Sequence, residues 1–390
     1  MLDLAPLRRV AAEYSTIRMK VNERWTHCER LIIITHMPPT QKELAKLAGV
    51  SAGTVSNVVN GVPGVSERAR KKVMAAIAAL NYQPNLIARS LRTNRTHTLG
   101  MVVPDITIPF FPKLIRGAES AARKAGFFLI VLDSENNRAR EADMLALLRA
   151  QRVEGILLVA AGETEATGSA YNALTTAGPP LVCLDRLPEG LEVDSVCVDD
   201  FQAAEMAVSH LREKGHSQIA VITGPLHLQN EQERLRGYRR ALQKSGIPVR
   251  DMLIWKGGFD DEEVANVCQQ GLLRPANRPT AVFATNGVTG LAALRAIYQM
   301  GLTTPDDLAF VTFDELNSEP LFRPGITSIV QPAYEIGSRA VESLLKRIEH
   351  NSAAEKPVER VRLPARLYVR ESTNGSAASY PKSKARTSRK

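Results

Sequence analysis

Two groups of residues in this sequence have types and spacing suited to chemistry, and both suit binding. In one, small polar side chains recur from Ser51 to Asn60, and such side chains hydrogen-bond the phosphates and base edges of DNA. In the other, carboxylates, amides, phenylalanines and Arg234 each follow an apolar run. Those groups hold the hydroxyls and cover the apolar faces of a polyhydroxylated ligand. The sequence has no G-x-G-x-x-G, Walker, H-E-x-x-H or G-x-S-x-G motif, which argues against an enzyme.

Charge is distributed unevenly over the 390 residues, whose net charge is +9. Residues 1–98 hold 15 Lys+Arg against 6 Asp+Glu, and residues 374–390 hold five basic residues and no acidic one, so residues 99–373 sum to −5. A basic head and a short basic tail therefore flank an acidic body. The head suits a polyanion such as DNA. For the tail, a role in solubility alone is the plainer explanation.

The cysteines and the apolar runs restrict the class of protein further. The four cysteines are far apart and form no C-x-x-C pair, so neither a disulfide framework nor a zinc site is predicted. No run approaches the ~18 apolar residues that a membrane span needs, and no signal peptide is recognisable near the start. We expect no metal, no cofactor, no membrane partner and a cytoplasmic location.

Residues 39–84 predict three short helices. Thr40 opens a capping box before the first helix, and Gly49 ends that helix because glycine adopts positive φ at little cost. Ser51 can cap the second helix and Ser66 the third. Two short helices joined by a tight glycine turn are typical of the helix-turn-helix, a DNA-binding motif.

The segment L-A-K-L-A-G-V-S-x-x-T-V-S-x-V-V-N-G closely resembles the signature of the LacI/GalR family of transcriptional regulators, and the resemblance continues to about residue 372. It implies that the second helix enters the major groove of an operator. Asn57 stands where many members have arginine; because asparagine favours adenine and arginine guanine, we expect a different half-site. The alternative is that Asn57 only caps or solvates the helix. The head residues expected to contact DNA are Thr40, Ser51, Ala52, Gly53, Thr54, Ser56, Asn57 and Asn60.

Residues 85–98 are the expected hinge. Taken alone they predict a two-turn helix too short to be stable, which suits a switch. The run A-R-S-L-R resembles the family's hinge helix, in which the residue at the place of Leu91 wedges into the minor groove. A plain linker is the alternative. The hinge residues expected to contact DNA are Asn85, Ala88, Arg89, Leu91 and Arg92.

Strand-like apolar runs alternate with amphipathic stretches through residues 99–372, in two successive sets. Continuous apolar strands separated by helices indicate parallel sheets covered on both faces, and two sets indicate two doubly wound lobes. The expected fold class is therefore α/β, with a three-helix head and a hinge helix before it. The resemblance identifies the two lobes as a periplasmic-binding-protein-like core.

Ligands of doubly wound folds bind beyond the carboxyl ends of the strands, and the candidate residues follow those ends. The run D-I-T-I-P-F-F resembles the family's D-x-S-N-P-F-F, and Arg234 matches the arginine that contacts effectors across the family. The plainer alternatives are core positions for Phe110 and Phe111, a turn for Asp314 and a surface salt bridge for Arg234. The residues expected to bind the effector are Asp105, Phe110, Phe111, Asp185, Asn230, Arg234, Phe259, Asn286 and Asp314.

Two departures from the family pattern bear on the effector. Leu228 and Asn230 stand where purine-responsive members have arginine and threonine, which disfavours a purine. Gly287 replaces the aspartate that usually follows the asparagine at 286, so the ligand's orientation cannot be copied from relatives. A sugar or sugar derivative is the expected effector. A non-sugar metabolite acting as corepressor is the alternative.

The ends of the chain complete the expected organisation. No leucine heptads follow residue 373, so a homodimer is expected. Because Met37 directly precedes the head, residues 1–36 are interpreted as a start-site artefact. The expected segments are an N-terminal extension (1–38), the helix-turn-helix domain (39–84), hinge and linker (85–98), effector-binding core (99–372) and basic disordered tail (373–390). Within the core, lobe 1 is expected at about 99–198 and 330–350, and lobe 2 at about 199–325 and 355–372.

The sequence thus predicts a DNA-binding transcriptional regulator, a repressor that a small molecule releases from a pseudo-palindromic operator. One alternative is a sugar-binding transport protein of the same two-lobed fold, which would need an export signal and no DNA-binding head. An enzyme built on scattered carboxylates is a further alternative that no motif supports.

Overall fold

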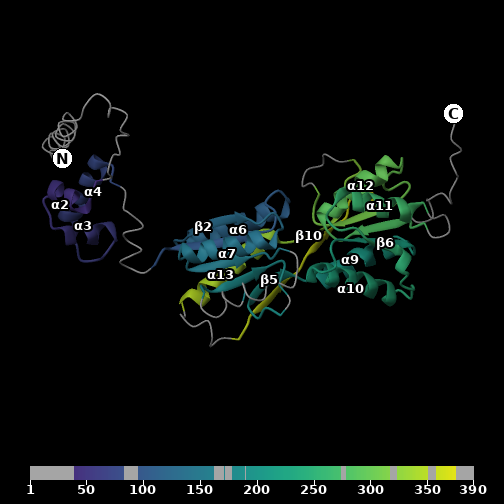
Figure 1. Ribbon diagram of the computed structural model, residues 1–390. Helices are drawn as coiled ribbons and strands as arrows, with labels where there is room; N and C mark the ends of the chain where they lie inside the picture. The colour runs from purple at the N-terminus through teal and green to yellow at the C-terminus, as the bar shows by residue number, and fades with distance from the viewer. Residues whose placement is uncertain are drawn as a thin grey trace, which may run out of the picture. The chain divides into compact units, whose positions relative to one another are not determined.

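The computed structural model describes residues 39–82, 95–161, 171, 178–188, 190–273, 278–316, 323–349 and 357–374. The chain divides into two compact units, a head that ends at Thr96 and a body that begins at His97 (Figure 1).

The described part of the head consists of α2 (Gln41–Ala48), α3 (Ala52–Val59) and α4 (Glu67–Leu80). The start of α2 is fixed by a reciprocal pair of bonds: Glu43 N donates to Thr40 Oγ1 at 3.3 Å, and Thr40 N donates to the Glu43 carboxylate at 2.7 Å. Leu44, Val55 and Val73, one from each helix, are fully buried and form the centre of the head's core. The predicted helix-turn-helix is therefore present.

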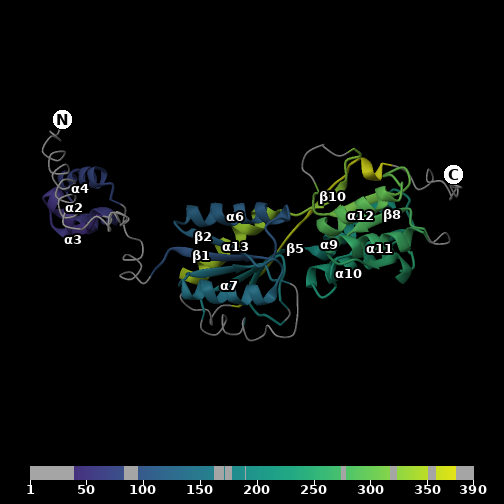
Figure 2. The ribbon, with the colours of Figure 1, turned by 45° about the horizontal axis from the view of Figure 1, so that its top comes forward.

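The first lobe of the body is built on six parallel strands in the order β11-β5-β4-β3-β1-β2. These strands are β1 (Thr98–Val103), β2 (Phe128–Asp133), β3 (Gly155–Leu158), β4 (Leu181–Leu184), β5 (Asp194–Val198) and β11 (Arg360–Leu363). Helices α6 (Phe110–Lys124) and α13 (Ala333–Glu349) pack on one face and α7 (Arg138–Ala150) on the other (Figure 2). Because β3 and β4 are buried on both faces, their sequences are continuously apolar.

The second lobe has the strand order β12-β10-β9-β8-β6-β7, and all neighbours are parallel except β10 and β12. Its strands are β6 (Ile219–Thr223), β7 (Ile254–Lys256), β8 (Ala281–Ala284), β9 (Ala309–Phe313), β10 (Thr327–Val330) and β12 (Arg366–Tyr368). Helices α9 (Asp200–Glu213) and α10 (Gln229–Lys244) cover one face, and α11 (Asp261–Leu272) and α12 (Gly287–Gln299) the other (Figure 1). Short 3-10 turns lie at Asp251–Leu253 and Glu371–Thr373.

The chain passes between the lobes after β5, between β10 and α13, and between β11 and β12. The third passage corrects the expectation that residues 355–372 belong to the second lobe. In the structure β11 pairs with β5 in the first lobe, and only β12 joins the second. Pro364 separates the two strands; because proline has no N–H to donate to a ladder, it marks the point where the chain leaves one sheet for the other.

Helices α6 and α13 approach unusually closely in the first lobe. A Cβ on Gly117 would lie 2.0 Å from the carbonyl oxygen of Tyr334, and one on Gly337 would lie 2.1 Å from that of Leu114. Only glycine permits this approach at either position. The two helices are therefore locked against each other, and the first lobe is tied together across residues far apart in the sequence.

Candidate DNA-binding surface and effector cleft

The start of α3 is exposed and held in place by Ser51. The amide of Thr54 donates to Ser51 Oγ at 3.1 Å, and the two hydroxyls lie 2.9 Å apart. This N-cap fixes the first turn, in which Ala52 and Gly53 are exposed. A helix start that presents small side chains lets its backbone approach a DNA groove closely. The structure thus leaves the start of α3 accessible to a DNA groove.

The two asparagines of α3 differ in their surroundings. Asn60 forms the C-cap, and its Nδ2 donates to the carbonyl of Ser56 at 2.6 Å. Asn57 is exposed, and its side chain has no hydrogen-bond partner among the described residues. The capping role considered for Asn57 is therefore filled by Asn60. Asn57 is left available for a base, whereas Asn60 and the capping-box residue Thr40 are engaged within the head.

The hinge residues expected to contact DNA lie outside the described residues, so their proposed contacts stay predictions. They are Asn85, Ala88, Arg89, Leu91 and Arg92.

In the body, most of the candidate effector residues follow the carboxyl ends of strands. In the second lobe the strand order reverses between β6 and β8, whose following loops contain Gly224 and Asn286. A Cβ on Gly224 would lie 2.7 Å from Asn286 Nδ2 and 2.9 Å from Glu231 Cδ. The two loops and the start of α10 therefore meet closely, as ligand-binding edges of doubly wound sheets do.

Arg234 lies at the centre of a buried polar cluster. Its Nε donates to Asp200 Oδ1 at 2.7 Å and its Nη1 to the carbonyl of Thr285 at 2.7 Å, while Glu231 Oε1 lies 3.5 Å away. The Phe313 ring covers the guanidinium with its centroid 3.6 Å away. Only 2% of Arg234 is exposed, so the surface salt bridge considered as an alternative is wrong.

Two carboxylates stand at the ends of their strands in a strained conformation. Asp185 follows β4 with φ 56°, and Asp314 follows β9 with φ 67°. Non-glycine residues rarely adopt this region, and residues that do so gather at ligand sites. Gln331 Nε2 donates to Asp314 Oδ1 at 2.7 Å and so fixes that carboxylate from the passage between β10 and α13.

Several buried polar atoms beside this cluster have no hydrogen-bond partner within the described part of the chain. They are Asp185 Oδ1, Arg186 Nε and Gln331 Oε1. Arg186 also reaches across the lobes, with its guanidinium 5.5 Å from the centroid of Phe259. Unpartnered buried groups are costly, so a cluster of them marks a place where a ligand's polar groups fit.

The electrostatics of the cleft are dominated by burial. Burial raises the pKa of Asp185 and Asp314 above the ordinary range, although Arg234 opposes this in both. Burial likewise raises the pKa of Asp200 to about 7, against the opposing effect of the same arginine. Desolvation therefore outweighs the stabilising charge of Arg234 at each of these carboxyl groups.

The structure does not bring all the candidates into this cluster. Phe111 is 2% exposed and Phe110 is buried against it, both within the first lobe's core, which favours the core alternative. The Asp105 carboxylate accepts bonds from Thr107 in its own turn. Asn230 is buried at the start of α10, where its Oδ1 accepts from the amide of Glu231 at 3.0 Å.

The sequence analysis missed four residues of the cluster: Asp200, Glu231, Arg186 and Gln331. Asp200 and Glu231 sit at helix starts, where an acidic residue is ordinary and gives no distinct signal. Arg186 directly follows Asp185 at a strand end, and its position alone could have identified it.

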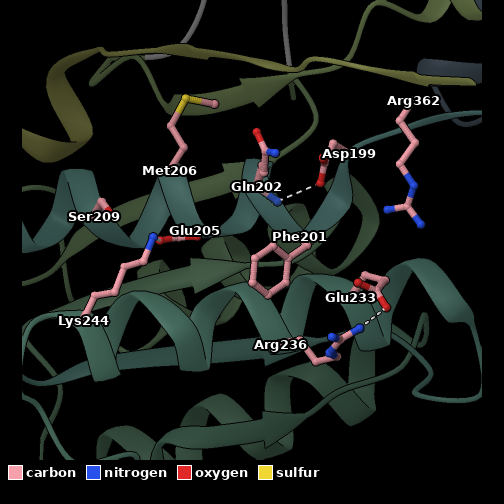
Figure 3. Close-up of a pocket in the computed structure, with 10 residues that line it drawn as sticks. All are labelled: Asp199, Phe201, Gln202, Glu205, Met206, Ser209, Glu233, Arg236, Lys244 and Arg362. Carbon is pink, nitrogen blue, oxygen red and sulfur yellow. Dashed lines mark hydrogen bonds and ion pairs between the residues drawn. The ribbon is translucent and has the colours of Figure 1, made fainter.

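A separate hollow lies along α9 and α10 and contains none of the candidate effector residues. This groove between α9 and α10 has a volume of about 680 Å³ (Figure 3). Its charged groups are largely paired with one another, as Lys244 is with Glu205 and Arg236 with Glu233. Its lining residues are Asp199, Phe201, Gln202, Glu205, Met206, Ser209, Glu233, Arg236, Lys244 and Arg362.

Among the described residues, no helix is both long and apolar enough to cross a membrane. The same residues contain no group of three or more His, Cys, Asp or Glu side chains arranged to hold a metal ion.

A helix-turn-helix head followed by two doubly wound lobes with a buried polar cluster defines a ligand-responsive DNA-binding regulator. The family model described as bacterial regulatory proteins of the lacI family matches residues 40–85. The model for periplasmic binding proteins and the sugar binding domain of the LacI family matches residues 96–371. The chain belongs to the LacI family, which confirms the resemblance and the fold class expected from the sequence.

Individual relatives agree with this assignment. The transcriptional repressor PurR of Photobacterium profundum is 34% identical over 311 residues, 80% of this chain and 92% of the relative. The ribose operon repressor of Escherichia coli is 35% identical over 309 residues, 79% of this chain and 93% of the relative. The crystal structure of the lac repressor dimer bound to operator and the anti-inducer ONPF has a TM-score of 0.75 at 28% identity, covering 86% of this chain and 99% of that one.

Proposed function

We propose that this LacI-family regulator is a cytoplasmic repressor that binds a pseudo-palindromic operator as a homodimer and is released by a sugar or sugar derivative. The observation that carries the proposal is the buried cluster around Arg234, with unpartnered polar atoms at strand ends, in a chain that also carries an exposed helix-turn-helix. Support comes from the sugar-binding description of the matching family model and from the repressors named among the relatives.

The proposed mechanism is a shift between two orientations of the lobes. Arg186 on the first lobe faces Phe259 on the second, and Gln331 lies in a passage between the lobes while holding Asp314. A ligand that contacts groups from both lobes binds one orientation more tightly than the other. The population of that orientation rises by an amount that the difference between the two affinities sets. In the proposal that difference lowers the affinity of the dimer for its operator.

The proposed DNA contacts are those of the exposed start of α3, together with the predicted hinge contacts. Asn57 is the residue we propose reads a base, because its amide has no hydrogen-bond partner within the described part of the chain. An asparagine amide pairs bidentately with adenine, and such a pair discriminates by ~1–3 kcal/mol.

The experiment is selection of bound duplexes from a randomised DNA pool by the full chain at about 0.15 M salt, which suppresses purely electrostatic binding. We expect a two-fold symmetric site. Asn57→Ala should lose preference at one position of each half-site, whereas Met74→Ala, on an exposed position of α4, should leave the site unchanged. Recovery of no symmetric site, with or without sugars present, would contradict the proposal.

The same preparation tests the absence of catalysis, because a regulator binds its effector without converting it. Each sugar that raises the melting temperature is recovered after incubation and its amount measured. Unchanged recovery together with release of the selected operator is the expected result. Turnover would reassign the cleft as an active site.

A further inference from the structure

The charged groups of the cleft do not balance. Four carboxylates and two guanidiniums interact there: Asp185, Asp200, Glu231, Asp314, Arg186 and Arg234. With every group ionised, this set has an excess of two negative charges. A buried excess of this kind persists only where a ligand, a proton or strained geometry compensates it.

Both guanidiniums are already partly engaged within the cluster. Arg234 uses Nε and Nη1 on Asp200 and the carbonyl of Thr285, and its face lies on Phe313. Arg186 donates through Nη1 to Asn136 Oδ1 at 3.0 Å and has Asp185 3.9 Å from its Nε.

Two cations further from the cluster are also engaged. Lys113 and Arg370 both pair with Glu315, which follows Asp314 in the chain.

The unpartnered atoms define which hydrogen-bonding groups a ligand must supply. Asp185 Oδ1 and Gln331 Oε1 are acceptors that need donors, and Arg186 Nε is a donor that needs an acceptor. Each of these three residues is at least nine-tenths buried, with 7%, 8% and 8% exposed. Hydroxyl groups satisfy all three because a hydroxyl both donates and accepts, whereas a phosphate or carboxylate only accepts.

We infer that the cleft selects its effector by charge, accepting an uncharged or amine-bearing polyol and rejecting phosphorylated and carboxylated sugars. This inference rests on the proposed effector role of the cleft and specifies the class of compound that it admits. An anion placed ~8 Å from one uncompensated carboxylate at an effective dielectric constant of ~20 binds about 30-fold more weakly than its neutral parent. A protonated amine at the same place binds more tightly than the neutral parent, because the carboxylate attracts it.

The test uses the full chain and matched ligand series. Glucose, galactose, ribose, arabinose and cellobiose are each compared with their phosphate, their sugar acid and, for the hexoses, their 2-amino derivative. Thermal shift finds the binders, and titration calorimetry gives their Kd. We expect at least one neutral sugar to bind, its phosphate and acid to bind at least ~30-fold more weakly, and its amine to bind as well or better.

A charge-removing variant separates charge selection from shape. Asp185→Asn keeps the side chain's size and removes one carboxylate, so the penalty on the phosphate and acid should shrink several-fold. Asp143→Asn makes the same change on the exposed face of α7 and should leave the penalty unchanged. An unchanged penalty in Asp185→Asn would assign the discrimination to shape and overturn the inference.

The remaining outcomes are also decisive. Binding of a phosphate or acid as tightly as its neutral parent, followed by operator release, overturns charge selection and leaves the proposed regulator intact. Failure of every neutral and amine-bearing sugar overturns the inference as well. The operator selection, which needs no ligand, then decides separately whether the chain is a DNA-binding regulator.

Discussion

Replacement of Arg234 by methionine tests whether the cleft is organised by one buried cation. The substitution keeps an unbranched side chain of similar length and removes the charge that faces Asp200 and Glu231. Removing one partner of a buried ion pair costs ~3–5 kcal/mol, because the other charge stays buried. Loss of the contact with Phe313 adds to this cost. We expect Arg234→Met to lower the free energy of unfolding by about 4 kcal/mol at pH 8.

The penalty should depend on pH with a defined sign. Without Arg234, the pKa of Asp200 in the folded state rises further above its value in the unfolded chain. The folded variant then binds more protons than the unfolded one, so its stability falls as the pH rises. The deficit relative to wild type is therefore smaller at pH 5 than at pH 8.

Urea unfolding followed by the fluorescence of Trp255 provides the measurement, since this residue is buried in β7 of the second lobe. Trp25 is replaced by phenylalanine throughout, because the chain has two tryptophans. The matched control is Arg236→Met on the same helix, where an exposed pair with Glu233 is lost and under about 1 kcal/mol should change. Equal losses in the two variants, or a deficit that does not grow from pH 5 to pH 8, would refute the reasoning.

Three further predictions concern stability. Gly117→Ala places a Cβ 2.0 Å from the Tyr334 carbonyl and should lower the free energy of unfolding by about 3 kcal/mol or more. The Cβ of Gly53→Ala meets nothing closer than 3.7 Å, so this change should stabilise the head by ~0.5–1 kcal/mol. Thermal unfolding of the two variants compares them. Burial lowers the pKa of His216 to about 4, so the unfolded chain takes up a proton on this side chain at a higher pH than the folded one does. Relative to His216→Asn, the wild type should therefore lose about 2 kcal/mol of unfolding free energy between pH 7 and pH 5. Parallel urea curves at the two pH values check this. Ser51→Ala removes the cap of α3 and should destabilise the head by ~1 kcal/mol, seen by circular dichroism as a lower melting temperature; no change would contradict the N-cap's role.

Much of the fold was predictable because its signals are local. The caps at Thr40, Ser51 and Ser66 are read from single residues, and all three are present. Strands such as β4 and β8 are continuous apolar runs, and such runs indicate strands that are buried on both faces of a sheet.

Features that depend on distant partners were not predictable. Strand β5 begins with a buried aspartate, Asp194, which reads as a loop residue until Arg347 of α13 is seen to pair with it at 2.6 Å. In the cleft, Asp200 and Glu231 gave no signal because their importance comes from Arg234, which reaches them only in the folded state. Phe111 was ambiguous for the same reason: an aromatic residue after a strand fits a ligand wall or a core equally well.

The link between β11 and β12 limits how the two lobes can move. From Leu363 to Arg366 the chain has three steps, which span at most about 11 Å when fully extended. Two other passages run between the same lobes, so translation of one lobe away from the other is blocked and rotation about the passages is the freedom that remains. Under the proposed mechanism, compounds that bind between the lobes differ in how far they stop this rotation, so that agonism and antagonism become positions along one coordinate.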